Sequence, residues 1–155
     1  MMTLAAEVIA ALAGKTLVTA ESCTGGGIGA ALTSVPGSSA VFKGGIISYC
    51  NEIKHLLLNV PEQMLQAFGA VSAPVARAMA EGARKNLDAD IAVSVTGLAG
   101  PDGDDKGNPV GTVFIGYADA DGSVVEECCF PGSREEIRDQ AVKAALEIII
   151  CKWKG

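Results

Sequence analysis

The sequence predicts an α/β protein, a three-layer α/β/α sandwich around a mixed, mostly parallel sheet of about five strands. Helix-like and strand-like segments alternate over most of the chain, which is typical of parallel strands joined by helices. Residues 90–96 (DIAVSVT) form an apolar run of strand length, the pattern of a central strand covered on both faces. The composition is 49% hydrophobic but only 5% aromatic, with 19 glycines, which suits tightly packed layers. We expect the 155 residues to form one domain.

The amino-terminal half predicts an opening helix after Thr3. Leu4, Val8, Ala11 and Leu12 fall on one helical face, and Gly14 ends the helix. The segments that follow are, in order, a strand at 16–20, a helix at 26–33, a strand at 42–49, a short helix at 51–58 and one or two helical turns at 61–68.

The carboxyl-terminal half predicts a clear helix that Ser72 caps and that ends near Asn86. Its expected buried stripe is Ala76, Met79, Ala80, Ala83 and Leu87. After the strand at 90–96 comes a polar loop at 97–109. Two strands, at 111–117 and 123–130, are joined by the turn DADG and predict a hairpin, which makes the sheet mixed. Ser133 and Glu136 form a capping box that begins a helix to about residue 152.

Charge and composition exclude several classes of function. The net charge is −6 and the sequence lacks the basic patch of a nucleic-acid-binding protein. No apolar run is as long as a membrane span, and the amino terminus lacks the basic region of a signal peptide. We therefore expect a cytoplasmic protein that acts on a small molecule and binds neither nucleic acid nor membrane.

The sequence predicts neither a metal site nor a disulfide framework. The acidic residues of the 97–109 loop lack the spacing of a calcium loop, and the cysteines lack the spacing of a zinc site. The cysteines are odd in number and are expected to be reduced thiols: Cys23, Cys50, Cys128, Cys129 and Cys151.

The segment 21–27 (ESCTGGG) is the strongest candidate for a reactive or anion-binding turn. It lies between a predicted strand and a predicted helix, where free N–H groups favour a phosphate or an oxyanion. Ser22, Cys23 and Thr24 each offer a nucleophile, and the glycines permit close approach of a ligand to the backbone. The alternative is that Ser22 or Thr24 only caps the next helix. The segment matches neither a Walker loop nor a Gly-x-Ser-x-Gly elbow.

Lys54 is a better candidate base than the single histidine, His55. Leu57 and Leu58 lie on the same side of the predicted helix as Lys54, and desolvation lowers the pKa of a lysine. Ser–Lys pairing is one way to activate a serine. The alternative, which the residues alone favour, is that Lys54 is an exposed side chain at the edge of the helix. His55 is predicted on a solvated face. Tyr49, at the end of the preceding strand, either donates a hydrogen bond at the site or packs as an ordinary aromatic.

Three loops should converge beyond the carboxyl ends of the parallel strands, at 21–27, 50–54 and 97–109. The third loop leaves the central strand through glycines, which favours a role in lining the site. Arg134 and Arg138 lie one helical turn apart and either pair with surface acids or present a fork to a phosphate.

Taken together, the motifs resemble those of the CinA C-terminal domain family, the nicotinamide mononucleotide amidohydrolases. The resemblance extends from about Leu4 to about Lys152. The matching segments are AESCTGG (20–26), PGSSAVFKGGIISYCNEIK (36–54), GAVS (69–72), SVTGLAGPDG (94–103), NPVGTV (108–113) and GSREEIRDQA (132–141).

The resemblance implies hydrolysis of the carboxamide of nicotinamide mononucleotide (NMN) to nicotinate mononucleotide and ammonia, without metal or cofactor. Ser22 matches the nucleophile, Lys54 the base and Tyr49 the tyrosine of a Tyr-x-Asn segment. Cys50 stands where the family usually has Ser or Thr, and Asp104–Asp105 where it often has small residues. We also expect backbone N–H groups near Gly25 and Gly26 to stabilise the oxyanion of the reaction. The expected substrate-binding residues are Thr24, Gly25, Gly26, Thr96, Gly97, Gly100 and Arg138.

Two other functions stay open at this point. One is a non-catalytic nucleotide-binding module in which Lys54 is only a counter-charge. The other is a hydrolase that uses Cys23 as its nucleophile. The apolar residues 148–150 and Trp153 are compatible with an interface of a homo-oligomer.

Overall fold

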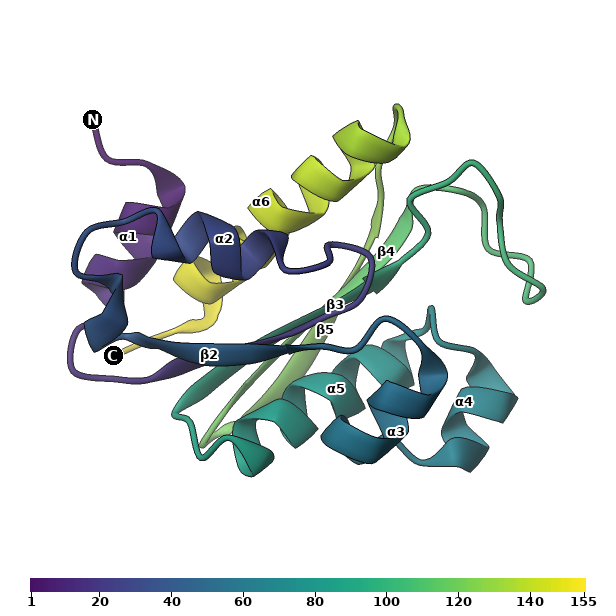
Figure 1. Cartoon of the computed structure of the whole chain (residues 1–155), viewed down its shortest axis with the longest axis horizontal. Helices are drawn as coiled ribbons and strands as arrows, with labels where there is room; N and C mark the ends of the chain where they lie inside the picture. The colour runs from purple at the N-terminus through teal and green to yellow at the C-terminus, as the bar shows by residue number, and fades with distance from the viewer.

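The computed structural model describes residues 1–155 as three layers, with a five-stranded sheet between two sets of helices (Figure 1). One face of the sheet carries α1 (Leu4–Ala11), α2 (Gly27–Thr33) and α6 (Arg134–Lys152). The other face carries α3 (Asn51–Leu58), α4 (Glu62–Phe68) and α5 (Ala73–Asn86). The predicted fold class is confirmed.

The sheet has the strand order β2-β1-β3-β4-β5. β1 pairs in parallel with β2 and β3, whereas β4 pairs antiparallel with β3 and β5. The carboxyl ends of the three parallel strands therefore lie at one end of the sheet, where the segments into α2 and α3 and the loop after β3 also lie (Figure 1). The strand bounds are β1 Leu17–Glu21, β2 Phe42–Ile47, β3 Ile91–Gly97, β4 Thr112–Asp119 and β5 Gly122–Cys129.

Local signals account for most element boundaries. The Thr3 hydroxyl accepts from the Ala6 N–H at the start of α1, and the capping box of Ser133 and Glu136 begins α6. Two details differ from expectation. Helix α1 ends at Ala11, before Gly14, and the Ser72 hydroxyl donates to the Gly69 carbonyl instead of capping α5.

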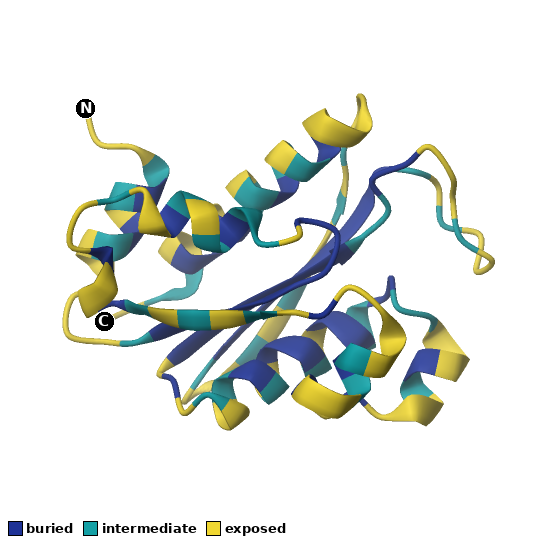
Figure 2. Cartoon of the chain, viewed as in Figure 1, coloured by how far each residue is buried: buried dark blue, intermediate teal, exposed yellow.

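The core has a layer on each side of the sheet, and the central strands are buried (Figure 2). Side chains alternate along β1: Leu17 packs on the α1–α2–α6 side, whereas Val18 and Ala20 pack on the α3–α5 side. The same alternation continues past the end of the strand. It turns Glu21 toward α2 and Ser22 toward α3.

The carboxyl-terminal apolar residues mostly belong to the core. Ile148 and Ile149 are buried and Trp153 packs against the same cluster, so only Ile150 of this group is exposed. None of the helices is long and apolar enough to cross a membrane. The five cysteines are unpaired, and no three metal-ligating side chains lie together.

Candidate active site

A cavity of about 420 Å³ opens at the carboxyl ends of the parallel strands. Its walls come from the β1–α2 turn, the segment between β2 and α3, residues 70–71, the loop after β3 and the start of α6. The three loops predicted to converge therefore do so. The predicted site residues that line the cavity are Ser22, Tyr49, Lys54, Thr96, Gly97 and Gly100.

Ser22 and Lys54 meet in this cavity although 32 positions separate them. The Lys54 Nζ lies 3.0 Å from the Ser22 Oγ, 2.7 Å from the Ser48 carbonyl and 3.3 Å from the Tyr49 carbonyl. The Lys54 side chain is 1% exposed. Desolvation by this burial lowers the pKa of Lys54 to about 8.

The partners of the amine determine where its lone pair points. The carbonyls of Ser48 and Tyr49 only accept, so they take two N–H groups of Lys54. A neutral amine has two N–H groups and one lone pair. The lone pair is then left for the Ser22 hydroxyl, which is able to donate as well as accept.

Glu21 is a buried site residue that the sequence interpretation missed. The residue is 2% exposed, and its carboxylate lies at the amino-terminal end of α2, where a negative charge is favourable. Alternation along β1, which turns Glu21 away from Ser22, is the signal that points to it. The carboxylate accepts from two hydroxyls and three backbone N–H groups: those of Thr19 and Thr24, and those of Gly26, Ile28 and Gly29.

The contacts of the turn show which N–H groups near Gly25 and Gly26 are free. The Gly26 N–H donates to Glu21 and the Gly25 N–H donates to the Ser22 carbonyl, so neither is free. The N–H groups of Cys23 and Thr24 have no acceptor within the protein. Of the turn between β1 and α2, these two groups are the ones available to an anion.

Arg138 lies against the outside of the same turn and does not line the cavity. Its Nε donates to the Cys23 carbonyl at 3.0 Å and its Nη2 to the Thr24 carbonyl at 3.2 Å. The Thr24 hydroxyl is also committed, at 2.7 Å from Glu21. The side chains of Thr24 and Arg138 and the N–H groups of Gly25 and Gly26 are therefore committed to shaping the turn.

Arg134, one helical turn earlier, does line the cavity. Its guanidinium donates to the Gly100 carbonyl and, at 3.2 Å, to the Tyr49 hydroxyl. The Tyr49 side chain is 62% exposed and its hydroxyl contacts neither Ser22 nor Lys54. The Thr96 hydroxyl donates to the Ala70 carbonyl. Arg134 and Tyr49 therefore form the exposed rim of the cavity.

The two cysteines nearest the site differ in their surroundings. Burial raises the pKa of the Cys23 thiol to about 11, so the thiol is protonated at neutral pH and is a poor nucleophile. Cys50 occupies the N-cap of α3 and its side chain makes no capping hydrogen bond. The raised pKa of the Cys23 thiol weighs against a hydrolase that uses Cys23 as its nucleophile.

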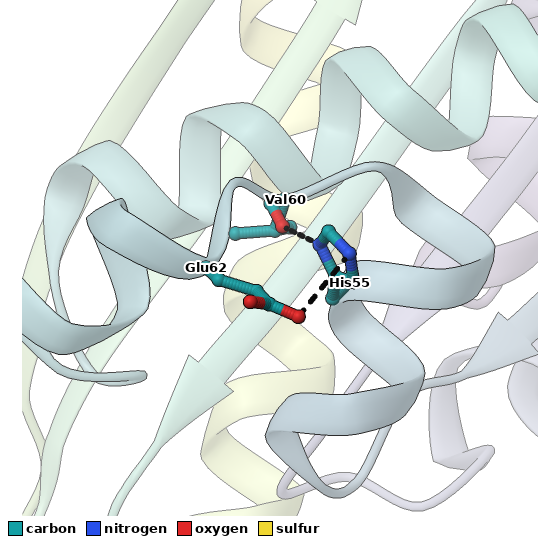
Figure 3. A network of polar contacts seen from close by, with 3 residues as sticks. All are labelled: His55, Val60 and Glu62. Atoms are coloured by element: carbon teal, nitrogen blue, oxygen red, sulfur yellow. Dashed lines mark hydrogen bonds and ion pairs between the residues drawn. The ribbon is translucent and has the colours of Figure 1, made fainter.

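His55 follows Lys54 on α3 but contacts Val60 and Glu62 (Figure 3) and does not line the cavity that contains Ser22. Its Nδ1 lies 2.8 Å from the Val60 carbonyl and its Nε2 lies 3.5 Å from the Glu62 carboxylate. A hollow of about 470 Å³ beside α3 and α4 contains this pair and no nucleophile. His55 is therefore not placed to act as the base for Ser22.

Known proteins are similar to this chain in sequence and in fold. The model of the CinA C-terminal domain matches residues 1–152. A CinA-like protein of Gemmatimonas aurantiaca is 50% identical over 85% of the chain and 31% of its own length. A CinA-like protein of Syntrophomonas wolfei is 48% identical over 95% of the chain and 36% of its own length. The chain thus spans about a third of the curated relatives it matches.

Two crystal structures have the same fold over nearly their whole length. The competence damage-inducible protein A of Klebsiella pneumoniae is 35% identical with a TM-score of 0.94, covering 97% of each chain. The competence/damage inducible protein of Agrobacterium tumefaciens is 41% identical with a TM-score of 0.92, covering 96% of this chain and 92% of its own. From sequence and fold together, the chain belongs to the CinA C-terminal domain family.

Proposed function

We propose that this protein hydrolyses the carboxamide of NMN to nicotinate mononucleotide and ammonia. The reaction comes from the resemblance to the amidohydrolases of the family. The observation that carries the proposal for this chain is the buried 3.0 Å contact between the Lys54 Nζ and the Ser22 Oγ. It joins a nucleophile to a base whose pKa of about 8 leaves a useful neutral fraction at neutral pH.

In the first half of the reaction, neutral Lys54 takes the Ser22 proton as the Oγ forms a bond to the carboxamide carbon. The protonated amine then gives that proton to the leaving nitrogen, the C–N bond breaks, and ammonia departs. An acyl-serine ester remains. The carbonyls of Ser48 and Tyr49 keep the amine oriented throughout.

In the second half, Lys54 takes a proton from water while the water oxygen bonds to the acyl carbon. The bond from that carbon to the Ser22 Oγ breaks and Lys54 returns the proton to the Oγ. The nicotinate product leaves as a carboxylate and its proton passes to solvent. Each turnover thus returns Ser22 and Lys54 to their starting state.

The negative charge of both tetrahedral intermediates is assigned to the N–H groups of Cys23 and Thr24. They follow the nucleophile directly and have no acceptor within the protein. One such donor typically contributes about 10²- to 10³-fold to the rate.

The substrate is proposed to enter past Tyr49 and Arg134 into the cavity that Thr96, Gly97 and Gly100 also line. Arg134 is the cation at the rim, and its guanidinium is suited to the phosphate of a mononucleotide. The scheme uses no metal or cofactor.

The test is ammonia release from NMN by Ser22→Ala, with Ser94→Ala as the matched control. Ser94 is also a buried serine, and its hydroxyl donates to the Ala76 carbonyl on the α5 side of β3. We expect Ser22→Ala to lose at least about 10³-fold in kcat and Ser94→Ala to keep its activity. Full activity in Ser22→Ala would remove the proposed nucleophile. Binding of NMN to the wild type without turnover would instead favour a nucleotide-binding module.

A further inference from the structure

The turn that carries Ser22 is held from two sides by opposite charges. The Glu21 carboxylate binds its N–H side, at 3.2 Å from the Gly26 N, 2.9 Å from the Ile28 N and 3.0 Å from the Gly29 N. The Arg138 guanidinium binds its carbonyl side at Cys23 and Thr24. Glu21 belongs to β1 and Arg138 to α6, which lie in different layers of the fold. The two side chains are linked through this turn.

Nearly all the remaining backbone groups of the turn are also paired. The Ser22 N–H donates to the Val95 carbonyl, the Gly25 N–H to the Ser22 carbonyl and the Gly27 N–H to the Thr24 carbonyl. Among the N–H groups of the turn, only those of Cys23 and Thr24 are left without an acceptor. Buried backbone donors are rarely left without a partner, so a pair of free ones beside a nucleophile requires a turn that is fixed in this conformation.

Glu21 is also linked to Lys54, the proposed base. Its backbone carbonyl accepts from the Ser48 N–H at 2.8 Å, and the Ser48 carbonyl accepts from the Lys54 Nζ at 2.7 Å. A shift of Glu21 therefore moves the nucleophile, the free N–H groups and one orienting partner of the base together.

We infer that Glu21 and Arg138 are positioning residues that set the geometry between the Ser22 Oγ and the free N–H groups of Cys23 and Thr24. The inference rests on the proposed hydrolysis. Neither side chain lines the cavity, so both act through the turn.

A carboxylate is required because every partner of Glu21 donates. A glutamine would place an NH₂ group where one carboxylate oxygen now lies. The hydroxyls of Thr19 and Thr24 are able to turn and accept from it, but the N–H groups of Gly26, Ile28 and Gly29 are not. Glu21→Gln keeps the shape of the side chain and loses at least one backbone contact.

The experiment compares Glu21→Gln with Asp90→Asn. Asp90 is the matched control because its carboxylate also accepts from a threonine hydroxyl and a backbone N–H, both of Thr16, at the other end of β1. A fluorophosphonate probe, which phosphonylates serine with loss of fluoride, reports the labelling rate constant and the fraction of competent sites. NMN turnover gives kcat and KM, each as a function of pH.

For Glu21→Gln we expect full labelling amplitude with a rate constant about 30- to 100-fold lower. The kcat for NMN should fall by a similar factor, with KM within about threefold and the pH midpoint unchanged. Asp90→Asn should label at the wild-type rate. Arg138→Gln, on the half-buried face of α6, should label about tenfold more slowly at full amplitude, and it serves as the second test where Glu21→Gln folds poorly.

Two results would overturn the inference. One is a wild-type rate constant in both Glu21→Gln and Arg138→Gln. The other is a reduced labelling amplitude with an unchanged rate constant per competent site, which is the signature of a purely structural role. A wild type that is labelled at Ser22 but releases no ammonia from NMN would contradict the proposed function, while the labelling rates would still decide the role of Glu21.

Discussion

Glu21 and Lys54 are two buried ionisable side chains at the same end of β1, on opposite faces of the sheet. Glu21 is 2% exposed and has five donors around one carboxylate. Lys54 is 1% exposed and has three partners, of which two only accept and the third, the Ser22 hydroxyl, is able to reverse its role. The comparison teaches that burial alone does not make a group reactive. The Glu21 carboxylate is held by three backbone N–H groups that only donate, so it fixes the turn. The Lys54 amine contacts a nucleophilic hydroxyl and is able to exchange a proton with it.

The largest expected effect comes from removing the amine of Lys54. Lys54→Met keeps the volume of the side chain and removes the amine, so kcat for NMN should fall by at least about 10³-fold. Calorimetry should show NMN binding retained, because the base contacts the nucleophile and not the substrate phosphate. Lys43→Met is the control, since Lys43 also donates to two backbone carbonyls, those of Leu87 and Asp88. Loss of binding with unchanged kcat at saturation would identify Lys54 as a counter-charge.

Removing the carboxylate of Glu21 should lower the stability of the fold. Glu21→Ala leaves three backbone N–H groups and two hydroxyls without their acceptor, so we expect the free energy of unfolding to fall by about 3 kcal/mol. Urea denaturation measures the change. Asp90→Ala, which loses the contacts of an exposed carboxylate, should cost about 1 kcal/mol. Equal losses in the two variants would contradict the distinction between a buried anchor and a surface contact.

The pH dependence of activity sharpens the role of the amine. The base must be neutral to accept a proton, and burial lowers the pKa of Lys54 to about 8. The kcat/KM for NMN should therefore rise about tenfold per pH unit below about pH 8 and level off above it. A profile that is flat between pH 6 and 8 would argue against a lysine base of this kind.

The smallest effect is expected at the neighbouring residue of α3. His55 contacts Val60 and Glu62 (Figure 3). It does not line the cavity that contains Ser22. His55→Gln should change kcat and KM for NMN by less than about twofold. A loss of tenfold or more in steady-state ammonia release would require a base other than Lys54.

The fold was predictable from the sequence, for identifiable reasons, whereas the pairing of Ser22 with Lys54 was expected from the resemblance to the family. The apolar run of β3, the capping box of α6 and the DADG hairpin each have a local cause that tertiary contacts reinforced. The residues alone left Lys54 open between a base and a surface side chain. The structure buries Lys54 and Leu58 on the inner face of α3, whereas Leu57, expected on the same side, is exposed.

What the sequence did not reveal depends on side-chain direction within a turn. The glycines suggested free N–H groups at Gly25 and Gly26, but only the folded turn shows that Glu21 and Ser22 already take them. Arg134 and Arg138 are separated by one helical turn, so periodicity places both on the same side of α6. Their different heights along the helix put one at the cavity rim and the other behind the turn.

The most direct test of the central claim is an NMR titration of Lys54 itself, in protein labelled with ¹³C at the lysine Cε and assigned by comparison with Lys54→Met. Activation of Ser22 by a buried amine predicts a midpoint near 8 for this lysine, matching the midpoint of the activity profile. A midpoint close to about 10.4, the value of a solvated lysine, would contradict it.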